Sequence, residues 1–219
     1  MNDDLTTYYD RRATEYEAIY AKPERQADLM AATQVLQAFF KEKEVLEVAC
    51  GTGYWTEKIA QTARSIKATD INESVLEIAR HKRYPNQNVA FEVADLYQLN
   101  LLRPSEALFG GFLWSHIPLQ ALPKFIQKTN ELVAAGGTVV MMDNRYVEGS
   151  STPIFSRDET GNTYQRRQLQ NGETYLVLKN FPNQTDLENA LQGKCSTLQC
   201  IQFQYFWIAV WQTNTPIVA

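Results

Sequence analysis

The sequence has few cysteines and no long hydrophobic run. Its three cysteines, Cys50, Cys195 and Cys200, form no Cys-x-x-Cys pair, and an odd number without an export signal disfavours a disulfide framework. This pattern supports neither a zinc site nor redox chemistry, so we expect no metal. The longest aromatic and aliphatic run, 205–211, is far shorter than the roughly 20 residues of a membrane-spanning helix. We therefore expect no membrane span.

The sequence also lacks an excess of charge of either sign. Lys and Arg number 21 against 25 Asp and Glu, which gives a net charge of −4, and no dense basic cluster occurs. Binding to nucleic acid or to an anionic membrane is therefore disfavoured. Residues 1–4 include two aspartates, Asp3 and Asp4, and are not followed by an apolar stretch, so no secretory signal is expected and a cytoplasmic location is predicted.

What the sequence does have is an ordinary globular composition, with 44% hydrophobic and 21% charged residues over 219 positions. This length favours one elaborated domain over two. Apolar residues recur at helical spacing between 5 and 20, which predicts an amphipathic helix with a tyrosine-rich buried face. Pro23 opens a second predicted helix, because proline is favoured in a first helical turn.

From residue 45 the pattern changes to alternating strands and helices. The predicted strands are 45–49, 65–69, 89–94, 107–114 and 138–142. Helices are expected after Gly53, near Asn72 and around Leu122, and the pair Gly136-Gly137 is expected to stop the last of them. This order predicts a parallel sheet with helices on both faces and a ligand beyond the carboxyl ends of the strands.

The pattern changes again after residue 143. Strands 164–170 and 173–179 flank Asn171-Gly172, a dipeptide typical of a type I′ hairpin. A short helix is expected within 186–191, and strands 198–202 and 205–212 are joined too tightly for a crossover, so they must pair antiparallel.

Chemistry-bearing residues gather at the ends of the first three predicted strands. Gly51 and Gly53 permit a sharp turn and close backbone approach to a ligand. Asp70 ends the second strand, 17 positions after Gly53, where a carboxylate can bind both hydroxyls of a ribose. Asp95 ends the third strand. Because the ends of neighbouring parallel strands meet, we expect one nucleoside-sized cleft, although each acid on its own could merely cap a helix.

These residues resemble the class I S-adenosylmethionine-dependent methyltransferases over about residues 5–145 and the final strand pair. The glycine loop of the family matches 47–53, except that Ala49 replaces the usual first glycine and slightly narrows the space beside the methionine part of the cofactor. The resemblance implies that Asp70 binds the ribose of S-adenosylmethionine and that Asp95 and Leu96 recognise its adenine.

The same resemblance implies a Rossmann-like, doubly wound α/β sheet of seven strands, mostly parallel with an antiparallel last strand. A single domain is expected over 1–219, comprising an N-terminal helical lid, a cofactor-binding core, an inserted hairpin, and a closing helix and strand pair, over 1–43, 44–145, 146–182 and 183–219. Further residues expected at the cofactor are Tyr9, Tyr16, Arg25, Glu47, Ala49, Cys50, Gly51, Gly53, Trp55, Ile71 and Trp114. The tyrosines have core packing, and Arg25 a solvated helix face, as alternative roles.

The methyl acceptor is expected beyond the fourth and fifth strands. His116 follows the fourth strand, and its role is either that of a base or that of an orienting hydrogen bond. Asn144, Arg145 and Tyr146 follow the fifth strand and are expected to line the acceptor pocket. In the hairpin, adjacent side chains of a strand point to opposite faces, so at most one of Arg166 and Arg167 should face this pocket.

The leading hypothesis is methyl transfer from S-adenosylmethionine to a nitrogen or oxygen of a small molecule, by a monomer or homodimer. Two alternatives stay open: a non-catalytic sensor or partner protein that binds the cofactor, and a methyltransferase acting on protein or RNA. A nicotinamide dehydrogenase is disfavoured because its fingerprint needs glycine or alanine at position 56, which is Thr56.

Overall fold

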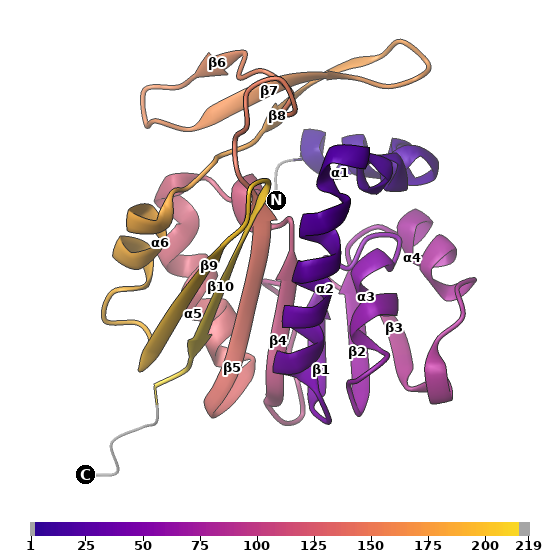
Figure 1. The fold of residues 1–219 in the computed structure, drawn as a ribbon, viewed down its shortest axis with the longest axis vertical. Helices are drawn as coiled ribbons and strands as arrows, with labels where there is room; N and C mark the ends of the chain where they lie inside the picture. Colours follow the sequence, from indigo (N-terminus) through magenta and orange to yellow (C-terminus); the bar gives the residue numbers. More distant parts are fainter. Residues whose placement is uncertain (1–2, 215–219) are drawn as a thin grey trace.

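The computed structural model describes residues 3–214, except for the side chains of residues 3–6, 13–16 and 86. Its centre is a seven-stranded sheet with the order β3-β2-β1-β4-β5-β10-β9 (Figure 1). The strands are β1 (Glu44–Val48), β2 (Ser65–Asp70), β3 (Val89–Val93), β4 (Ser105–Gly111), β5 (Val133–Asn144), β9 (Thr197–Gln202) and β10 (Phe206–Gln212). All neighbours from β3 to β5 are parallel, and β10 is antiparallel to both β5 and β9. The predicted sheet is confirmed.

Helices cover both faces of this sheet and make three layers. One face carries α2 (Gln26–Phe40), α3 (Tyr54–Ile59) and α4 (Glu73–Arg80); the other carries α5 (Leu122–Glu131) and α6 (Gln184–Leu191). Successive strand residues alternate between the faces, so Val45 packs in the first hydrophobic core and Leu46 in the second. Among the described helices, none is both long and apolar enough to cross a membrane.

Short helical turns complete the chain. They are η1 (Ala13–Ala21), η2 (Pro23–Arg25), η3 (Pro85–Gln87), η4 (Trp114–His116) and η5 (Leu119–Ala121). The helix predicted over 5–20 was wrong in its continuity: α1 (Asp3–Arg11) ends and η1 continues with tighter 3₁₀ winding. The two parts pack against different elements. Tyr8 of α1 contacts the ring of Tyr175 in β8 (Thr174–Leu178), whereas Tyr20 of η1 stacks on Tyr54 in α3 with 3.7 Å between the ring centroids.

The fourth strand is shorter than the predicted 107–114. It ends at Gly111 because Phe112 adopts a left-handed backbone conformation with a φ of 58°, which turns the chain out of the sheet and into η4. The pair Gly136-Gly137 does not stop α5, which ends at Glu131. Instead it lies inside β5, where the pairing with β4 is irregular.

A second, three-stranded sheet is built by β6 (Ser156–Arg157), β7 (Thr163–Gln168) and β8 (Thr174–Leu178). It lies beyond the same end of the central sheet as α1 (Figure 1). The hairpin between β7 and β8 is confirmed, but its type I′ turn was wrong, because Gly172 has a positive φ and Asn171 does not. Gly172 N–H donates to the carbonyl of Leu169, and Leu169 N–H donates to that of Glu173, which makes a three-residue loop with a bulge.

Two glycines with left-handed backbones, one in a crowded position and one in an open position, test how much the crowding contributes to stability. Gly53 (φ 78°) precedes α3, and a Cβ there would lie 2.7 Å from the Tyr84 hydroxyl and 3.0 Å from the Ala79 Cβ. At Gly172 (φ 88°) a Cβ would meet nothing within 4 Å. We expect Gly172→Ala to lower the free energy of unfolding by about 1 kcal/mol through backbone strain alone, and Gly53→Ala to lower it further. Urea unfolding measures both, and equal losses would contradict the crowding at Gly53.

Candidate active site

The turn after β1 repeats a left-handed backbone at alternate residues. The φ angles are 53° at Ala49, 56° at Gly51 and 78° at Gly53. Ala49 therefore keeps the conformation that a glycine would adopt without strain, at a cost of about 1–2 kcal/mol. The turn is tied to β2, because Cys50 N–H donates to the Thr69 carbonyl at 3.0 Å.

The carboxylate of Asp70 links this turn to the start of the next helix. Its Oδ2 accepts a hydrogen bond from Gly51 N–H at 2.9 Å, and its Oδ1 accepts one from Asn72 N–H at 3.0 Å. Burial raises the pKa of Asp70, and these amides oppose that rise. Asp95, at the end of the third strand, accepts from Tyr97 N–H at 2.9 Å.

A cavity opens where the ends of β1, β2, β3 and β4 meet, and we call it the strand-end cavity. Its walls are mainly apolar, and the two carboxylates Asp70 and Asp95 lie in its lining. The predicted convergence of the glycine turn and these two acids is therefore confirmed. The lining residues are Tyr9, Val48, Ala49, Gly51, Thr69, Asp70, Ile71, Asn72, Val75, Ala94, Asp95, Leu96, Gly111, Phe112, Leu113 and His116.

His116 and Tyr9 form a hydrogen-bonded pair at the edge of this cavity. His116 Nδ1 lies 2.6 Å from the Leu178 carbonyl, which can only accept, so Nδ1 carries the proton and Nε2 accepts from the Tyr9 hydroxyl at 2.7 Å. Burial holds the pKa of His116 well below 6.5, and the charges of Lys179 and Arg167 lower it further. The imidazole is therefore neutral near pH 7.

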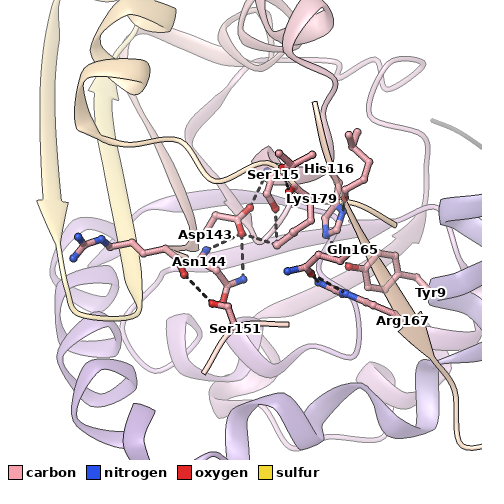
Figure 2. Close-up of polar contacts among 12 residues, drawn as sticks. Tyr9, Ser115, His116, Asp143, Asn144, Ser151, Gln165, Arg167 and Lys179 are labelled. Carbon is pink, nitrogen blue, oxygen red and sulfur yellow. Dashed lines mark hydrogen bonds and ion pairs between the residues drawn. The ribbon is translucent and has the colours of Figure 1, made fainter. Parts of the chain in front are cut away.

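A second cavity of about 330 Å³ adjoins the first, and Tyr9 and Phe112 line both. It lies between the N-terminal helical segments, the region after β5 and the small sheet. We call it the cationic cavity, because no Asp or Glu occurs among its described lining residues, whereas five cationic residues do: Arg12, Lys22, Arg25, Arg167 and Lys179. Two of them, Arg167 and Lys179, appear together with their polar partners in Figure 2.

Lys179 is held by a buried polar cluster at one wall of the cationic cavity. Its ammonium group donates to Asp143 Oδ1 at 2.9 Å and to the Ser115 hydroxyl at 2.5 Å (Figure 2). Asp143 Oδ2 in turn accepts from Ser115 N–H. Burial lowers the pKa of Lys179, and the Asp143 carboxylate opposes this effect. The cluster fixes β5, η4 and the end of β8 to one another.

Comparison with known proteins supports the reading of the strand-end cavity. A family model described as a methyltransferase domain matches residues 45–137. The solved structure of DhpI in complex with SAH is 27% identical, with a TM-score of 0.79, over 97% of this chain and 96% of that chain. The family-model match and the likeness to this complex support a class I S-adenosylmethionine-dependent methyltransferase. Its cofactor is accordingly S-adenosylmethionine.

Two further relatives are more distant. The malonyl-[acyl-carrier protein] O-methyltransferase of Priestia megaterium is 24% identical over 73% of this chain, and the match spans 62% of that protein, which is less than two thirds of its length. The N-methyltransferase NodS of Bradyrhizobium japonicum is 14% identical, with a TM-score of 0.61, over 88% of this chain and 98% of that chain. The NodS match concerns the fold alone.

The strand-end cavity fits the cofactor of this family. Each carboxylate oxygen of Asp70 accepts one backbone amide and keeps a lone pair that a ribose hydroxyl can use. The left-handed turn brings backbone rather than side chains to the cavity wall at Gly51, and Leu96 and Leu113 provide apolar surface for a flat ring.

The structure brings about half of the predicted cofactor residues to this cavity. Those that line it are Tyr9, Ala49, Gly51, Asp70, Ile71, Asp95 and Leu96. Glu47, Cys50, Gly53, Trp55 and Trp114 are buried beside or behind it and are absent from its described lining. Arg25 lines the cationic cavity instead. The side chain of Tyr16 lies outside the described residues, and the contacts of all these residues with the cofactor stay predictions.

Both tryptophans on that list have core partners. Trp114 packs edge-on against Phe125 and Trp207 in the second hydrophobic core. Trp55 packs in the first core, against Tyr54 among others. Cys50 is also inert in this setting, because burial raises the pKa of its thiol well above 9.0.

Of the three residues predicted at the acceptor pocket, only Asn144 lines the cationic cavity. The Arg145 guanidinium donates to the Phe203 carbonyl, and Tyr146 is exposed and packs against Phe181. Of the two hairpin arginines, one lies at the cationic cavity. Arg167 lines the cavity, whereas Arg166 stacks over Phe155 at 3.8 Å.

Three of the cations, Arg12, Lys22 and Lys179, were not predicted from the sequence. They lie far apart along the chain and form no motif, and the chain as a whole is slightly acidic. The one available signal was the absence of acidic residues between 160 and 172 around the hairpin arginines, which is too weak to place a pocket.

Glu47 gives a testable effect of pH on stability. Burial raises the pKa of this carboxyl from 4.5 to about 8, so between these values the unfolded chain ionises and the folded chain does not. The free energy of unfolding therefore falls as the pH rises from about 4.5 to 8, by up to about 5 kcal/mol. We expect Glu47→Gln to flatten this decline in urea unfolding at pH 5 and pH 8.

Glu92→Gln makes the same substitution on an exposed strand residue and controls for the loss of one carboxyl. If the free energy of unfolding of Glu47→Gln fell between pH 5 and pH 8 as steeply as that of the wild type, the raised pKa of Glu47 could not be the cause of the decline.

The tautomer of His116 is directly measurable, because the chain has only two histidines. We expect long-range ¹H–¹⁵N spectra to show a neutral ring protonated at Nδ1 that does not titrate between pH 5.5 and 8, since its pKa is lowered by burial. His81→Gln identifies the other set of signals. A ring that becomes charged within this range would show that the pair with Tyr9 is not as described.

Proposed function

We propose that this methyltransferase transfers the methyl group of S-adenosylmethionine to a nitrogen or oxygen of a small molecule by in-line displacement. The observation that carries this proposal is the contact between the two cavities at Tyr9 and Phe112. A donor in the strand-end cavity and an acceptor in the cationic cavity can meet there without any rearrangement of the sheet. Alignment of two bound reactants is the main contribution that such a reaction needs.

The chain's residues have separate tasks in this proposal. When bound, S-adenosylmethionine supplies a methyl group on a sulfonium, which is already a good leaving group. Asp70 holds the ribose hydroxyls, and Asp95 with Leu96 orients the adenine. Tyr9, carried by α1, closes the meeting point of the cavities and excludes water from it.

His116 orients Tyr9 in this proposal and does not act as the base. Both of its ring nitrogens are engaged, Nδ1 with the Leu178 carbonyl and Nε2 with the Tyr9 hydroxyl. Its lowered pKa also makes it a weak proton acceptor. Of the two roles open to this residue from the sequence, the geometry favours the orienting one.

The size of the cationic cavity and the elements that cover it favour a small molecule over a protein or RNA as the acceptor. Its volume of about 330 Å³ lies at the lower end of the range of small-molecule sites, and α1 and the small sheet flank it. Among the relatives, one is named a malonyl-[acyl-carrier protein] O-methyltransferase, and DhpI has been solved with SAM and HEP. A cytoplasmic monomer or homodimer without a nucleic-acid partner completes the proposal.

Calorimetric titration with S-adenosylhomocysteine tests the cofactor site. Asp70→Asn keeps the shape of the side chain but removes the charge that binds the ribose, so we expect affinity to fall about tenfold to a hundredfold, as for lost hydrogen bonds to a charged group. Glu92→Gln, on the exposed side of the neighbouring strand, should bind like the wild type. Equal affinity of Asp70→Asn and the wild type would remove the assignment.

Labelled cofactor distinguishes an enzyme from a sensor. We expect methyl label to appear in a small product when the protein is incubated with pooled cell metabolites. Label found only in protein or RNA would overturn the choice of acceptor. Cofactor binding with no transfer to any acceptor would favour a non-catalytic sensor.

A further inference from the structure

Three residues of the cationic cavity, Lys22, Arg25 and Arg167, have only neutral oxygens as partners in their described hydrogen bonds. Lys22 and Arg25 converge on one acceptor, the Ser150 carbonyl, at 2.7 and 3.2 Å. Arg25 is 8% exposed and also donates to the Ser150 hydroxyl and to Asn144 Oδ1. The exposed Glu24 reaches the Ser150 hydroxyl, but no carboxylate of the described residues forms an ion pair with Arg25.

A second group of cations lines the side of the cavity nearest Tyr9. Arg167 donates to Gln165 Oε1 at 2.7 and 3.2 Å, which is a neutral partner, and it also interacts with the hydroxyls of Tyr8 and Tyr9. Lys179 is paired with Asp143, whose Oδ1 lies 2.9 Å from the ammonium nitrogen. Arg12 lies near enough to Arg167 and Lys179 for their charges to act on the same neighbours, including the His116 ring.

This arrangement is costly for the protein alone. Like charges taken out of water repel one another, and a charge without an opposite partner loses hydration that neutral amides and hydroxyls only partly replace. A solvated surface would disperse such charges, whereas here they line a single concave site. An anionic ligand in the cavity would provide the missing counter-charge, and guanidinium groups bind planar or tetrahedral oxyanions through paired N–H donors.

We propose that the methyl acceptor is a small molecule bearing an oxyanion, a carboxylate or a phosphonate, and that Arg25, Arg167 and Lys22 bind this group. The inference rests on the proposed function. The oxyanion oxygen is also the nucleophile, because His116, the residue placed best to act as a base, carries a proton at Nδ1 and has the lone pair of Nε2 engaged by the Tyr9 hydroxyl. An oxygen that is already ionised needs no base.

The step balances without a proton transfer. A lone pair of the acceptor oxygen forms the new O–CH₃ bond, while the S–CH₃ bond breaks and its electron pair stays on sulfur. The sulfonium becomes a neutral thioether, and the acceptor loses one negative charge as it becomes a methyl ester. Because the product carries less negative charge than the substrate, the cationic cavity binds it less tightly, which favours its release.

Binding without turnover is the first test. Protein loaded with S-adenosylhomocysteine is titrated calorimetrically with acetate, methylphosphonate and the neutral isostere acetamide. We expect saturable binding of at least one anion and none of acetamide. Arg167→Gln should weaken anion binding at least tenfold, and Arg167→Lys should recover part of the loss. Arg166→Gln is the matched control, since this neighbouring arginine stacks on Phe155 outside the cavity, and it should bind like the wild type.

Product analysis is the second test and separates the two oxyanions. With methyl-labelled cofactor, we expect the anion that binds to yield a labelled methyl ester with one negative charge fewer. Label on a carbon or nitrogen of an anionic acceptor would overturn the assignment of the nucleophile. Acetamide binding as tightly as acetate, or equal anion binding by Arg167→Gln and wild type, would overturn the anion site.

A variant that still binds S-adenosylhomocysteine is folded. The same measurement separates the anion inference from the proposed function on which it rests. If the wild type binds S-adenosylhomocysteine but neither anion, the anion inference fails and the proposed function stands. If the wild type does not bind S-adenosylhomocysteine, both fail. The salt dependence is a further readout, because anion binding by the cations of this cavity should weaken as added chloride competes for them.

Discussion

The carboxylate of Asp70 is the interaction on which the site depends. With one oxygen on Gly51 N–H and the other on Asn72 N–H, it joins the turn after β1 to the chain that leaves β2. Those two bonds hold the backbone of the left-handed turn in place and fix the floor of the strand-end cavity. Because the carboxylate is already positioned, a ribose can bind without further ordering of this part of the protein.

The parts of the site that follow from strand ends were predictable from the sequence. Parallel strands end at one edge of a sheet, so the positions of Gly51, Asp70 and Asp95 in the sequence sufficed to bring them together. Strand boundaries depended on periodicity and were accurate to a few residues. The largest difference is in the fifth strand, which begins at Val133 rather than at 138. The fourth strand ends at Gly111 rather than at 114, because Phe112 takes a left-handed backbone conformation that no propensity favours for a phenylalanine. The division of the single domain into lid, core, hairpin and closing pair stays a prediction.

The acceptor side was not predictable in the same way, because it is built by tertiary contacts. Arg12 and Lys22 reach the cavity through the change from α-helix to 3₁₀ winding after Arg11, and periodicity alone indicated one continuous helix. Arg167 reaches it because the small sheet folds over the end of the central one. Alternation along β7 was the one feature of the hairpin that the sequence could predict, and it agrees with Arg167 lining the cationic cavity while Arg166 stacks on Phe155. The donor site thus follows from the strand order of the sheet, whereas the acceptor site depends on contacts between segments far apart in the sequence.

The central claim is that two adjoining cavities, one for the cofactor and one for an anionic acceptor, meet at Tyr9 and Phe112. A crystal structure of the protein with S-adenosylhomocysteine and methylphosphonate or acetate tests it most directly. We expect the ribose on Asp70, the thioether sulfur facing Tyr9, and the anion against Arg167 and Arg25. A sulfur directed away from the cationic cavity, or an ordered anion only at the protein surface, would contradict the account.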